Sequence, residues 1–318
     1  MADQAPYAST LAADAARVTE LAAIASWAQI GRGDEKHADQ LAVDAMRTAL
    51  NALDIDGKIV IGEGERDEAP MLYIGEKVGT GKGPVIDIAL DPLEGTTLTA
   101  KAMANALTVL SMSPGGGMLH APDTYMDKIA IGPGYATGTV DLDMTPSDNV
   151  RSLASAKGVR PEDITVCVMD RPRHAELIAA LREVGAKVML ITDGDVAGVI
   201  HTAEPETGID LYLGSGGAPE GVLAASALKC VGGHFQGRLI FRNDEERARA
   251  NRTGVTDFDR KYDLHELVSK DAIFAATGVT EGAMLDGVQV RDGFVSTHTL
   301  VMDSSTRTVQ RIRTIRPL

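Results

Sequence analysis

The residues with the clearest potential for chemistry lie in the segment Asp91-Pro92-Leu93-Glu94-Gly95-Thr96-Thr97. Directly before it, residues 85–90 form an apolar run rich in β-branched side chains, which predicts a buried strand. Two carboxylates and a hydroxyl would then stand together at the end of a rigid strand. Such oxygen ligands suit a hard divalent cation and an attacking water. The spacing therefore predicts a metal-assisted hydrolytic site.

Further acidic and glycine-rich loops follow other predicted strands. They are 62–65, which contains Glu63, Asp193-Gly194-Asp195, and 214–221, which contains Glu220. Because the carboxyl ends of strands line the ligand crevice of an α/β sheet, we expect these loops to converge. Converging carboxylates repel one another unless cations lie among them. Oxygen ligands without a cysteine or histidine cluster favour Mg²⁺ or Mn²⁺ over Zn²⁺.

Each of these loops also has a purely structural interpretation. Asp-Gly-Asp is a common turn or helix cap, and Glu63 suits a solvated turn. Glu220, next to Pro219, suits the first turn of a helix, where the dipole favours an acid. The number of acidic groups, rather than any single one, indicates a metal site.

Asp39 lies in a predicted helix that Asp34 would cap. Apolar residues recur at helical spacing from Ala42 to Leu53, and Asp39 precedes Ala42 on the same stripe. A carboxylate on the core-facing side of a helix needs a partner, which a metal ion would supply. The alternatives are a frayed first turn with Asp39 in water, or an interaction of Asp39 with the helix dipole.

A basic segment, Arg171-Pro172-Arg173, follows a predicted strand at 164–169. Two guanidinium groups at a strand end can bind a phosphate by bidentate hydrogen bonds. The alternative is a helix start that happens to be basic, although arginine there opposes the helix dipole. His174 is interpreted as a cap or a surface residue. The C-terminal arginines, from Arg307 to Arg316, predict the solvated face of an edge strand.

The elements that would position these residues alternate between helix and strand. Helices are predicted over 10–30, from Asp34, after Arg173, from Asp195 and from Pro219, and strands over 58–62, 85–90, 107–112, 128–131, 164–169, 187–192 and 209–213. The tail, 293–302 and 306–316, predicts an antiparallel pair. This pattern predicts an α/β fold whose second sheet is mainly parallel. We expect an α+β subdomain at 1–145 and an α/β subdomain at 146–318, with strands at 288–316 that could pack with either sheet.

The bulk composition limits the possible partners. The chain has 318 residues, 44% of them hydrophobic, and a net charge of −14. This acidity argues against nucleic acid or a membrane as the main partner, whereas bound metal ions would still permit a phosphorylated substrate. Cys167 and Cys230 give neither a disulfide framework nor a zinc spacing. Because no signal peptide and no long apolar span are visible, we expect a cytoplasmic protein.

The segment Asp91–Thr96 resembles the Asp-Pro-(Ile/Leu)-(Asp/Glu)-Gly-(Ser/Thr) signature of the lithium-sensitive, metal-dependent phosphatases. Further matches resemble the class II fructose-1,6-bisphosphatases within that superfamily: Gly31-Arg32-Gly33-Asp34, 61–65, 67–73, Asp193-Gly194-Asp195, 216–221 and Ala276-Thr277-Gly278. The resemblance spans about residues 10 to 318. It implies a layered α-β-α-β-α sugar-phosphatase sandwich, with the active site in the cleft between two subdomains.

The resemblance also implies a role for each matching residue. Asp39 and Glu63 would bind one metal ion, and Asp91, Glu94 and Glu220 a second. Thr96 would orient the attacking water, with Asp67 as a candidate proton acceptor. The substrate would contact Glu94, Gly95, Thr96, Tyr125, Arg171, Pro172, Arg173, Asp193, Gly194, Asp195 and Gly217. Lys36 is a further candidate, because many relatives carry lysine directly after Gly-Arg-Gly-Asp, where this chain has Glu35.

The implied reaction is hydrolysis of the 1-phosphate of fructose 1,6-bisphosphate, a step of gluconeogenesis, with Mn²⁺ or Mg²⁺ as cofactor. One alternative is an enzyme that also, or instead, accepts sedoheptulose 1,7-bisphosphate. The arginine pair disfavours an inositol monophosphatase, because it predicts a second phosphate on the substrate. A non-catalytic sugar-phosphate sensor is the alternative from another class. The resemblance further implies a homodimer or homotetramer.

Overall fold

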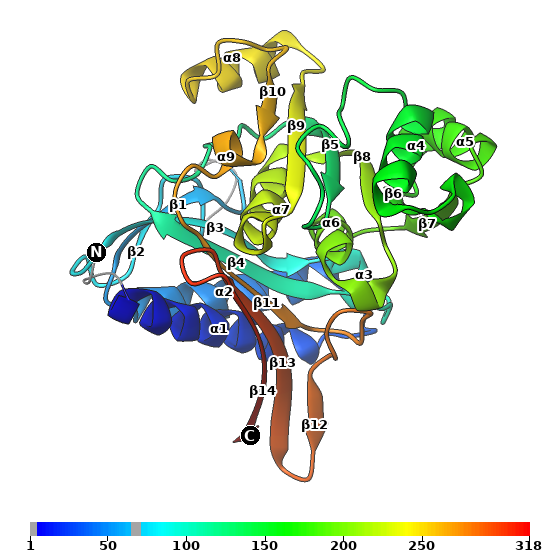
Figure 1. Cartoon of the computed structure of the whole chain (residues 1–318). Helices are drawn as coiled ribbons and strands as arrows, with labels where there is room; N and C mark the ends of the chain where they lie inside the picture. Colours follow the sequence, from blue (N-terminus) through cyan, green and yellow to red (C-terminus); the bar gives the residue numbers. More distant parts are fainter. Residues whose placement is uncertain (1–4, 65–70) are drawn as a thin grey trace. The chain divides into compact units, whose positions relative to one another are not determined.

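The computed structural model describes residues 5–64 and 71–318. The chain divides into two compact units, Met1–Leu119 with Val268–Leu318, and His120–Leu267. Each unit has its own β-sheet and its own helices (Figure 1). The units differ from the predicted subdomains 1–145 and 146–318, because residues 120–145 fold with the second sheet and the C-terminal strands return to the first.

The first unit contains an eight-stranded mixed sheet in the order β12-β13-β11-β4-β3-β1-β2, with β14 paired to β13. Its strands are β1 (Asp56–Ile61), β2 (Lys77–Val78), β3 (Val85–Glu94), β4 (Leu107–Pro114), β11 (Ile273–Gly278), β12 (Gln289–Arg291), β13 (Phe294–Asp303) and β14 (Thr308–Pro317). Among the described strand pairs of this sheet, only β1 and β3 are parallel. The predicted antiparallel pair at the C-terminus is therefore confirmed, and it belongs to this sheet.

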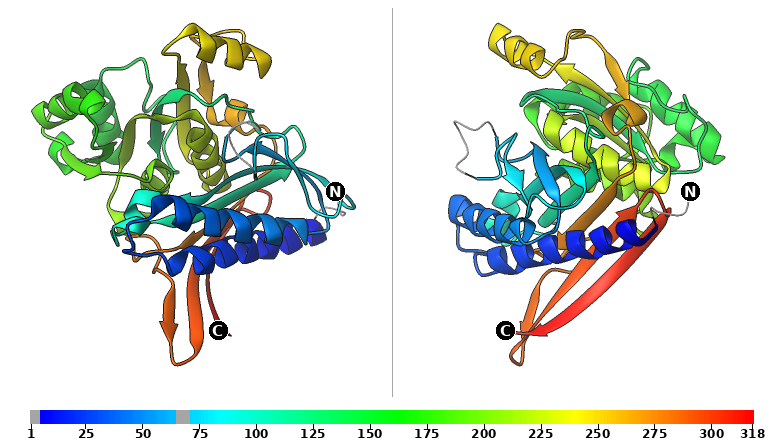
Figure 2. Two further views of the ribbon diagram at one scale, coloured as in Figure 1. Left: turned by 180° about the vertical axis from the view of Figure 1, so that it is seen from behind. Right: turned by 90° about the vertical axis from the view of Figure 1, so that its left-hand side faces the viewer.

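Two long helices, α1 (Ala5–Trp27) and α2 (Glu35–Asn51), lie side by side in the first unit (Figure 2). α1 packs on strands β3, β4, β11 and β13, and α2 packs on β3. Asp34 caps α2, as predicted, by accepting a 3.0 Å hydrogen bond from the backbone nitrogen of His37. The apolar stripe of α2 is buried in the core of this unit, where Met46 and Leu50 have no exposed surface. The short helix α3 (Thr96–Ala100) follows β3.

The second unit contains a six-stranded sheet in the order β10-β9-β5-β8-β6-β7. Its strands are β5 (Tyr125–Ile131), β6 (Thr165–Met169), β7 (Lys187–Ile191), β8 (Leu211–Gly217), β9 (His234–Ile240) and β10 (Lys261–Asp263). Strands β7, β6 and β8 are parallel, as predicted. However, β5 inserts antiparallel between β8 and β9, so only half of the sheet is parallel. The expectation of a mainly parallel sheet was wrong for that half, because β5 comes from the segment assigned to the other subdomain.

Helices connect and flank the strands of the second unit (Figure 1). They are α4 (Pro146–Lys157), α5 (Ala175–Glu183), α6 (Asp195–Ile200), α7 (Ala218–Val231), α8 (Asp244–Arg252) and α9 (Leu264–Leu267), with 3₁₀ turns at Pro161–Asp163, Pro172–His174, His201–Ala203 and Pro205–Thr207. Ile129, Val166 and Leu211 are fully buried in the core of this unit. No helix in the described part of the chain is long and apolar enough to cross a membrane.

The arginines of β14 do not all lie on one solvated face. Arg313 pairs with the half-exposed Asp286, whereas Arg316, on the opposite face of the strand, forms an ion pair with Glu20 of α1. Thr314 donates a 2.5 Å hydrogen bond to the same Glu20, whose side chain is only 6% exposed. One face of β14 therefore closes over α1, so the predicted solvated strand is only half solvated.

We expect Arg316→Ala to lower the free energy of unfolding by about 1–3 kcal/mol, because it leaves the buried Glu20 carboxylate short of a charged partner. Arg313→Ala, on the same strand, is the matched control and should cost less than about 1 kcal/mol, since its pair is exposed to water. Urea unfolding of both variants measures the difference. Equal losses would contradict a buried role for the Glu20 pair.

Candidate active site

The acidic segment after Leu90 continues strand β3 instead of ending it. The pairing of β3 with β4 shifts register between Asp91 and Glu94, so β3 carries a bulge at this point. Pro92 fits there, because a bulge does not require its missing N–H. The backbone nitrogen of Leu93 donates a 3.0 Å hydrogen bond to Asp91 Oδ1. Since bulges re-aim side chains, this one sets the directions of both carboxylates.

Gly95 joins the bulge to helix α3, whose first residue is Thr96. Its φ of +91° is the left-handed conformation that favours glycine. A Cβ at this position would also lie 2.8 Å from the Leu98 side chain. Thr96 is half-buried, and Glu94 is only 5% exposed. The backbone thus holds Asp91, Glu94 and Thr96 on one short, rigid segment.

Asp39 and Asp91 interact although they are far apart in the sequence. Asp39 is half-buried on α2, and its burial together with the negative charge of Asp91 raises the pKa of Asp39 to about 6. Neither a frayed first turn nor full solvation agrees with that environment. Two carboxylates that destabilise each other are the arrangement that a bound cation relieves. The donor chemistry of this pair therefore fits a divalent metal ion.

Glu63 follows strand β1. Its backbone nitrogen donates a 3.1 Å hydrogen bond to the carbonyl of Leu72, and a Cβ on neighbouring Gly62 would collide with that carbonyl. Asp67 lies outside the described residues. Within the described ranges, no three His, Cys, Asp or Glu side chains gather closely enough to hold a metal ion. The full ligand set proposed from the sequence therefore stays a prediction.

In the second unit, Arg173 is fixed to strand β8 by two hydrogen bonds. Its Nε donates to Ser215 Oγ at 3.0 Å, and its Nη2 donates to the Ser215 carbonyl at 2.6 Å. Arg171 and Pro172 precede it at the end of β6, where Pro172 opens a 3₁₀ turn. This part of the structure brings the predicted basic segment to the glycine-rich end of β8.

His174 occupies the N-cap position of α5 but is buried, so its interpretation as a surface residue was wrong. Its side chain makes no capping hydrogen bond to α5, and the residue is 4% exposed. The backbone nitrogen of Ser215 donates to its Nε2 at 2.9 Å, and its Nδ1 lies 2.7 Å from the carbonyl of Met169. The imidazole is therefore neutral with its proton on Nδ1, and burial lowers its pKa. It joins β6 to β8 and so holds the turn that carries Arg173.

Asp195 forms a buried ion pair that the sequence analysis missed. Its Oδ2 lies 2.6 Å from Nζ of Lys128, and the two side chains are 7% and 1% exposed. The sequence signal that could have revealed this pair is Lys128, a charged residue among the buried positions of strand β5. Asp193 and Gly194 precede this pair, and Gly194 caps α6 in the left-handed conformation. The Asp193-Gly194-Asp195 segment thus forms the start of α6 without a side-chain capping hydrogen bond, and its contact with a sugar stays a prediction.

Tyr125 lies at the start of β5, directly opposite Gly217 of β8. The guanidinium carbon of Arg173 lies 5.0 Å from the centre of the Tyr125 ring. These three predicted substrate residues are thus neighbours within the second unit. Glu220, in the first turn of α7, folds back so that a Cβ at Gly217 would collide with its carboxylate. Lys36, in contrast, is exposed on the first turn of α2.

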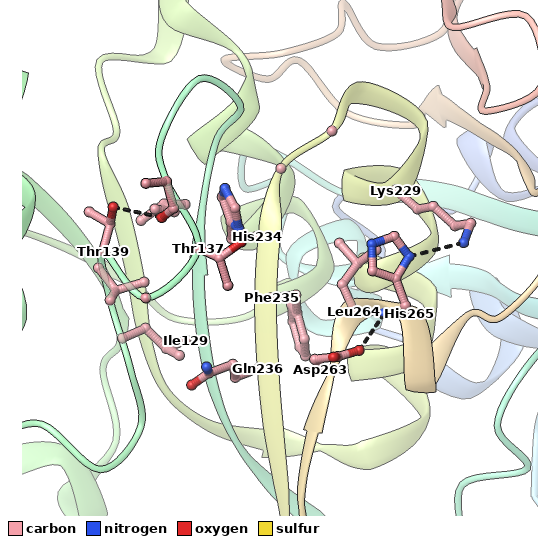
Figure 3. A pocket seen from close by; sticks show the side chains of 16 residues that line it. Ile129, Thr137, Thr139, Lys229, His234, Phe235, Gln236, Asp263, Leu264 and His265 are labelled. Atoms are coloured by element: carbon pink, nitrogen blue, oxygen red, sulfur yellow. Dashed lines mark hydrogen bonds between the residues drawn. The ribbon is translucent and has the colours of Figure 1, made fainter. Parts of the chain in front are cut away.

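The second unit also contains a cavity of about 230 Å³ beside β9 (Figure 3). Among its lining residues, His234 Nε2 lies 2.8 Å from the Tyr135 carbonyl, and Lys229 Nζ lies 3.5 Å from Nδ1 of His265. Asp263 is its single carboxylate. Because none of the predicted site residues that the structure describes lines this cavity, it is separate from them.

We expect Asp91→Asn to stabilise the metal-free protein by up to about 1 kcal/mol at pH 7.5, because it removes the charge that opposes ionisation of Asp39. The asparagine Oδ1 can still accept the hydrogen bond from Leu93. The same change should abolish the gain in stability that Mn²⁺ gives the wild type. Urea unfolding in chelator and in Mn²⁺ measures both effects.

Asp44→Asn, at an exposed position of α2, is the matched control. It should change neither the stability in chelator nor the gain in stability from Mn²⁺. A loss of stability of Asp91→Asn in chelator would show that Asp91 supports the fold rather than a cation site.

Comparisons with known proteins agree with the motifs. The family model of the bacterial fructose-1,6-bisphosphatases encoded by glpX matches residues 9–316. A class 2 fructose-1,6-bisphosphatase of Escherichia coli (strain K12) is 45% identical over 322 residues, which cover 97% of this chain and 95% of the relative. A relative from Synechococcus sp. (strain JA-3-3Ab), named D-fructose 1,6-bisphosphatase class 2/sedoheptulose 1,7-bisphosphatase, is 46% identical over 323 residues, which cover 94% of this chain and 93% of the relative.

Among solved structures, an inositol monophosphatase from Anabaena (Nostoc) sp. PCC 7120 matches with a TM-score of 0.31 and 12% identity, over 60% of this chain and 71% of that one. That similarity is too low to establish a shared fold. The match of the family model and the identity to the E. coli relative extend over nearly the whole chain. On this evidence the chain belongs to the bacterial class 2 fructose-1,6-bisphosphatases, a family of phosphatases.

Proposed function

We propose that this protein hydrolyses the 1-phosphate of fructose 1,6-bisphosphate, producing fructose 6-phosphate and inorganic phosphate, a step of gluconeogenesis. The observation that carries the proposal is 45% identity to a class 2 fructose-1,6-bisphosphatase over 97% of the chain. The bulged Asp91–Thr96 segment and the mutual effect of Asp39 and Asp91 support it. We expect the enzyme to act in the cytoplasm as a homodimer or homotetramer.

Phosphate monoesters hydrolyse extremely slowly in water, and an enzyme accelerates the reaction mainly by positioning and by neutralising charge. The family implies a divalent metal ion, and we propose Mn²⁺ or Mg²⁺. The residues that would hold the ions are Asp39, Glu63, Asp91, Glu94 and Glu220. Bound there, the ions would lower the pKa of the attacking water and neutralise the leaving oxygen.

Thr96 and Asp67 complete the proposed chemistry at the 1-phosphate. Thr96 is the first residue of α3 and follows the rigid turn at Gly95. Its hydroxyl would orient the attacking water by accepting or donating one hydrogen bond. Asp67 would accept the proton that the water loses. The water would attack in line with the departing sugar oxygen, without a covalent phosphoenzyme.

The remaining substrate contacts would come from the second unit and from the β3 bulge. Arg171 and Arg173 would bind the distal phosphate, with Pro172 stiffening their turn. Arg173 is already oriented by Ser215, so binding costs little additional ordering of its side chain. The sugar would contact Asp193, Gly194, Asp195, Gly217, Glu94 and Gly95. A role for Lys36 is not supported by any contact among the described residues.

A second candidate is an enzyme that hydrolyses sedoheptulose 1,7-bisphosphate as well. The observation that favours it is the name of the Synechococcus relative, which includes both activities. One extra carbon with its hydroxyl would be distinguished only by the wall of the substrate site, and such differences are worth about 1–3 kcal/mol. The ratio of kcat/KM for the two bisphosphates decides between a single and a dual specificity.

We expect phosphate release from fructose 1,6-bisphosphate to require Mn²⁺ or Mg²⁺ and to stop when a chelator is added. The reason is that the carboxylates of the site carry the same sign of charge as the reacting phosphate, so a bound cation is needed to offset their repulsion. A screen of sugar phosphates with each ion measures this. Inositol 1-phosphate should be a poor substrate. Binding of the bisphosphate without any turnover would instead identify a sugar-phosphate sensor.

We expect Arg173→Ala to raise KM for fructose 1,6-bisphosphate by about tenfold to a hundredfold, with a smaller effect on kcat. A charged hydrogen bond made equally in the ground and transition states contributes about 1.5–3 kcal/mol to binding and little to the chemical step. Arg182→Ala, at an exposed position of α5, is the matched control. An unchanged KM would exclude Arg173 from substrate binding.

A further inference from the structure

Arg242 is a second arginine on the Tyr125 ring, and the sequence analysis did not identify it. Its guanidinium carbon lies 5.0 Å from the ring centre, the same distance as that of Arg173. Tyr125 pairs with Gly217 of β8 on one side and with Ile240 of β9 on the other. Arg173 approaches from the turn after β6, and Arg242 from the link between β9 and α8. Two separate segments of the second unit thus converge on the ring that β5 carries.

Glu246 of α8 fixes the position of Arg242. Its Oε1 accepts from Nε of Arg242 at 2.7 Å and from Nη2 at 2.5 Å, and its Oε2 accepts from the Arg242 backbone nitrogen at 2.7 Å. Glu246 is 1% exposed, and its own backbone nitrogen is capped by Asn243. Its Oε2 also lies 3.2 Å from the hydroxyl of Thr124, which directly precedes Tyr125. One buried carboxylate therefore ties Arg242 to the start of β5.

The two arginines are held in the same manner. Each uses its Nε and Nη2 for its anchor, which is Ser215 for Arg173 and Glu246 for Arg242. A guanidinium has five N–H donors, so three on each arginine make no hydrogen bond to the described residues. The Arg242 side chain is 58% exposed, so these donors can be reached from solvent. Both groups are oriented in advance, and both keep donors for a ligand.

The charges around the ring favour an anion. Ser215, which anchors Arg173, is neutral, so this arginine forms no ion pair with the residues that the structure describes. Glu246 neutralises one charge of the two arginines, so the pair retains a net positive charge that a phosphate dianion would balance. Tyr125 would supply a flat platform that keeps both groups in place by cation–π contact.

We propose that Arg242 is a substrate-binding residue that, with Arg173, binds the distal phosphate of the sugar bisphosphate, and that Glu246 positions it. This inference rests on the proposed function and adds a residue to its phosphate subsite. The ligand class is a phosphate monoester dianion. If Arg242 served only to pack on Tyr125, its removal would change stability but not phosphate affinity.

The test is calorimetric titration of the chelated, metal-free protein with fructose 6-phosphate, so that binding is measured without catalysis. We expect Arg242→Gln to raise Kd by about tenfold or more. Arg247→Gln, at an exposed position of α8, is the matched control and should leave Kd unchanged. Arg242→Lys keeps the charge but loses the planar fork, so its Kd should lie between those of the wild type and Arg242→Gln.

Arg242→Lys also serves as the test if Arg242→Gln does not fold, because it retains a cation for Glu246. Glu246→Gln should raise Kd less than Arg242→Gln, since it loosens the arginine without removing it. A Kd for Arg242→Gln within twofold of the wild type, in a folded protein, would overturn the inference.

Turnover separates this inference from the proposed function. If the wild type releases phosphate from the bisphosphate while Arg242→Gln keeps the wild-type KM and Kd, the role of Arg242 is wrong and the reaction stands. If the wild type shows no turnover but binds fructose 6-phosphate through Arg242, the subsite stands and the proposed reaction falls. Absence of fructose 6-phosphate binding by the wild type would overturn the subsite.

Discussion

The burial of the Asp39 carboxylate beside the charge of Asp91 is the constraint on which the proposed chemistry depends. Helix α2 holds one carboxylate and the bulge of β3 holds the other, and burial, with a further contribution from the charge of Asp91, raises the pKa of Asp39. The fold tolerates this cost because α2 buries an apolar stripe in the core of the first unit. A bound cation would be coordinated by the carboxylates of Asp39 and Asp91 and would offset their repulsion. If these residues bind the ion as proposed, the protein without metal would be less stable than it would be without this buried pair of acids.

Local patterns predicted most elements of the fold but not their long-range pairing. The cap at Asp34 and the strands around Val85 and Thr165 depend on neighbouring residues, so the sequence alone was sufficient. Strand β5 was assigned to the wrong unit, because its partners β8 and β9 come about a hundred residues later. The same limit applied to the C-terminal strands. The alternation of polar and apolar residues in β13 predicts a strand but does not show that it pairs with β11. The choice of a partner strand depends on which apolar surfaces are buried in the tertiary structure, and the sequence of a single strand does not reveal this.

The candidate site divides in the same way. The Asp91–Thr96 motif is contiguous, so its residues were identified together. In contrast, the ion pairs of Asp195 with Lys128 and of Arg242 with Glu246 were not predicted, because each depends on a tertiary or helix-end contact that residue types do not show. Lys128 and Asp195 are 67 residues apart, and each is buried only because the other neutralises it. Glu246 looks like an ordinary first-turn acid of a helix until its contact with Arg242 is seen.

The glycine-rich segment 214–217 shows why residue type alone was insufficient. The sequence analysis interpreted it as a loop, whereas the structure places it in strand β8. His174 packs 3.2 Å from where a Cβ on Gly214 would lie, and side chains at Gly216 and Gly217 would collide with the carboxylates of Asp195 and Glu220. The side chains of His174, Asp195 and Glu220 can therefore approach this strand only because positions 214, 216 and 217 are glycine. The glycines make room for these side chains beside β8. Ser215, which lies between Gly214 and Gly216, binds Arg173 and so fixes the turn that carries it.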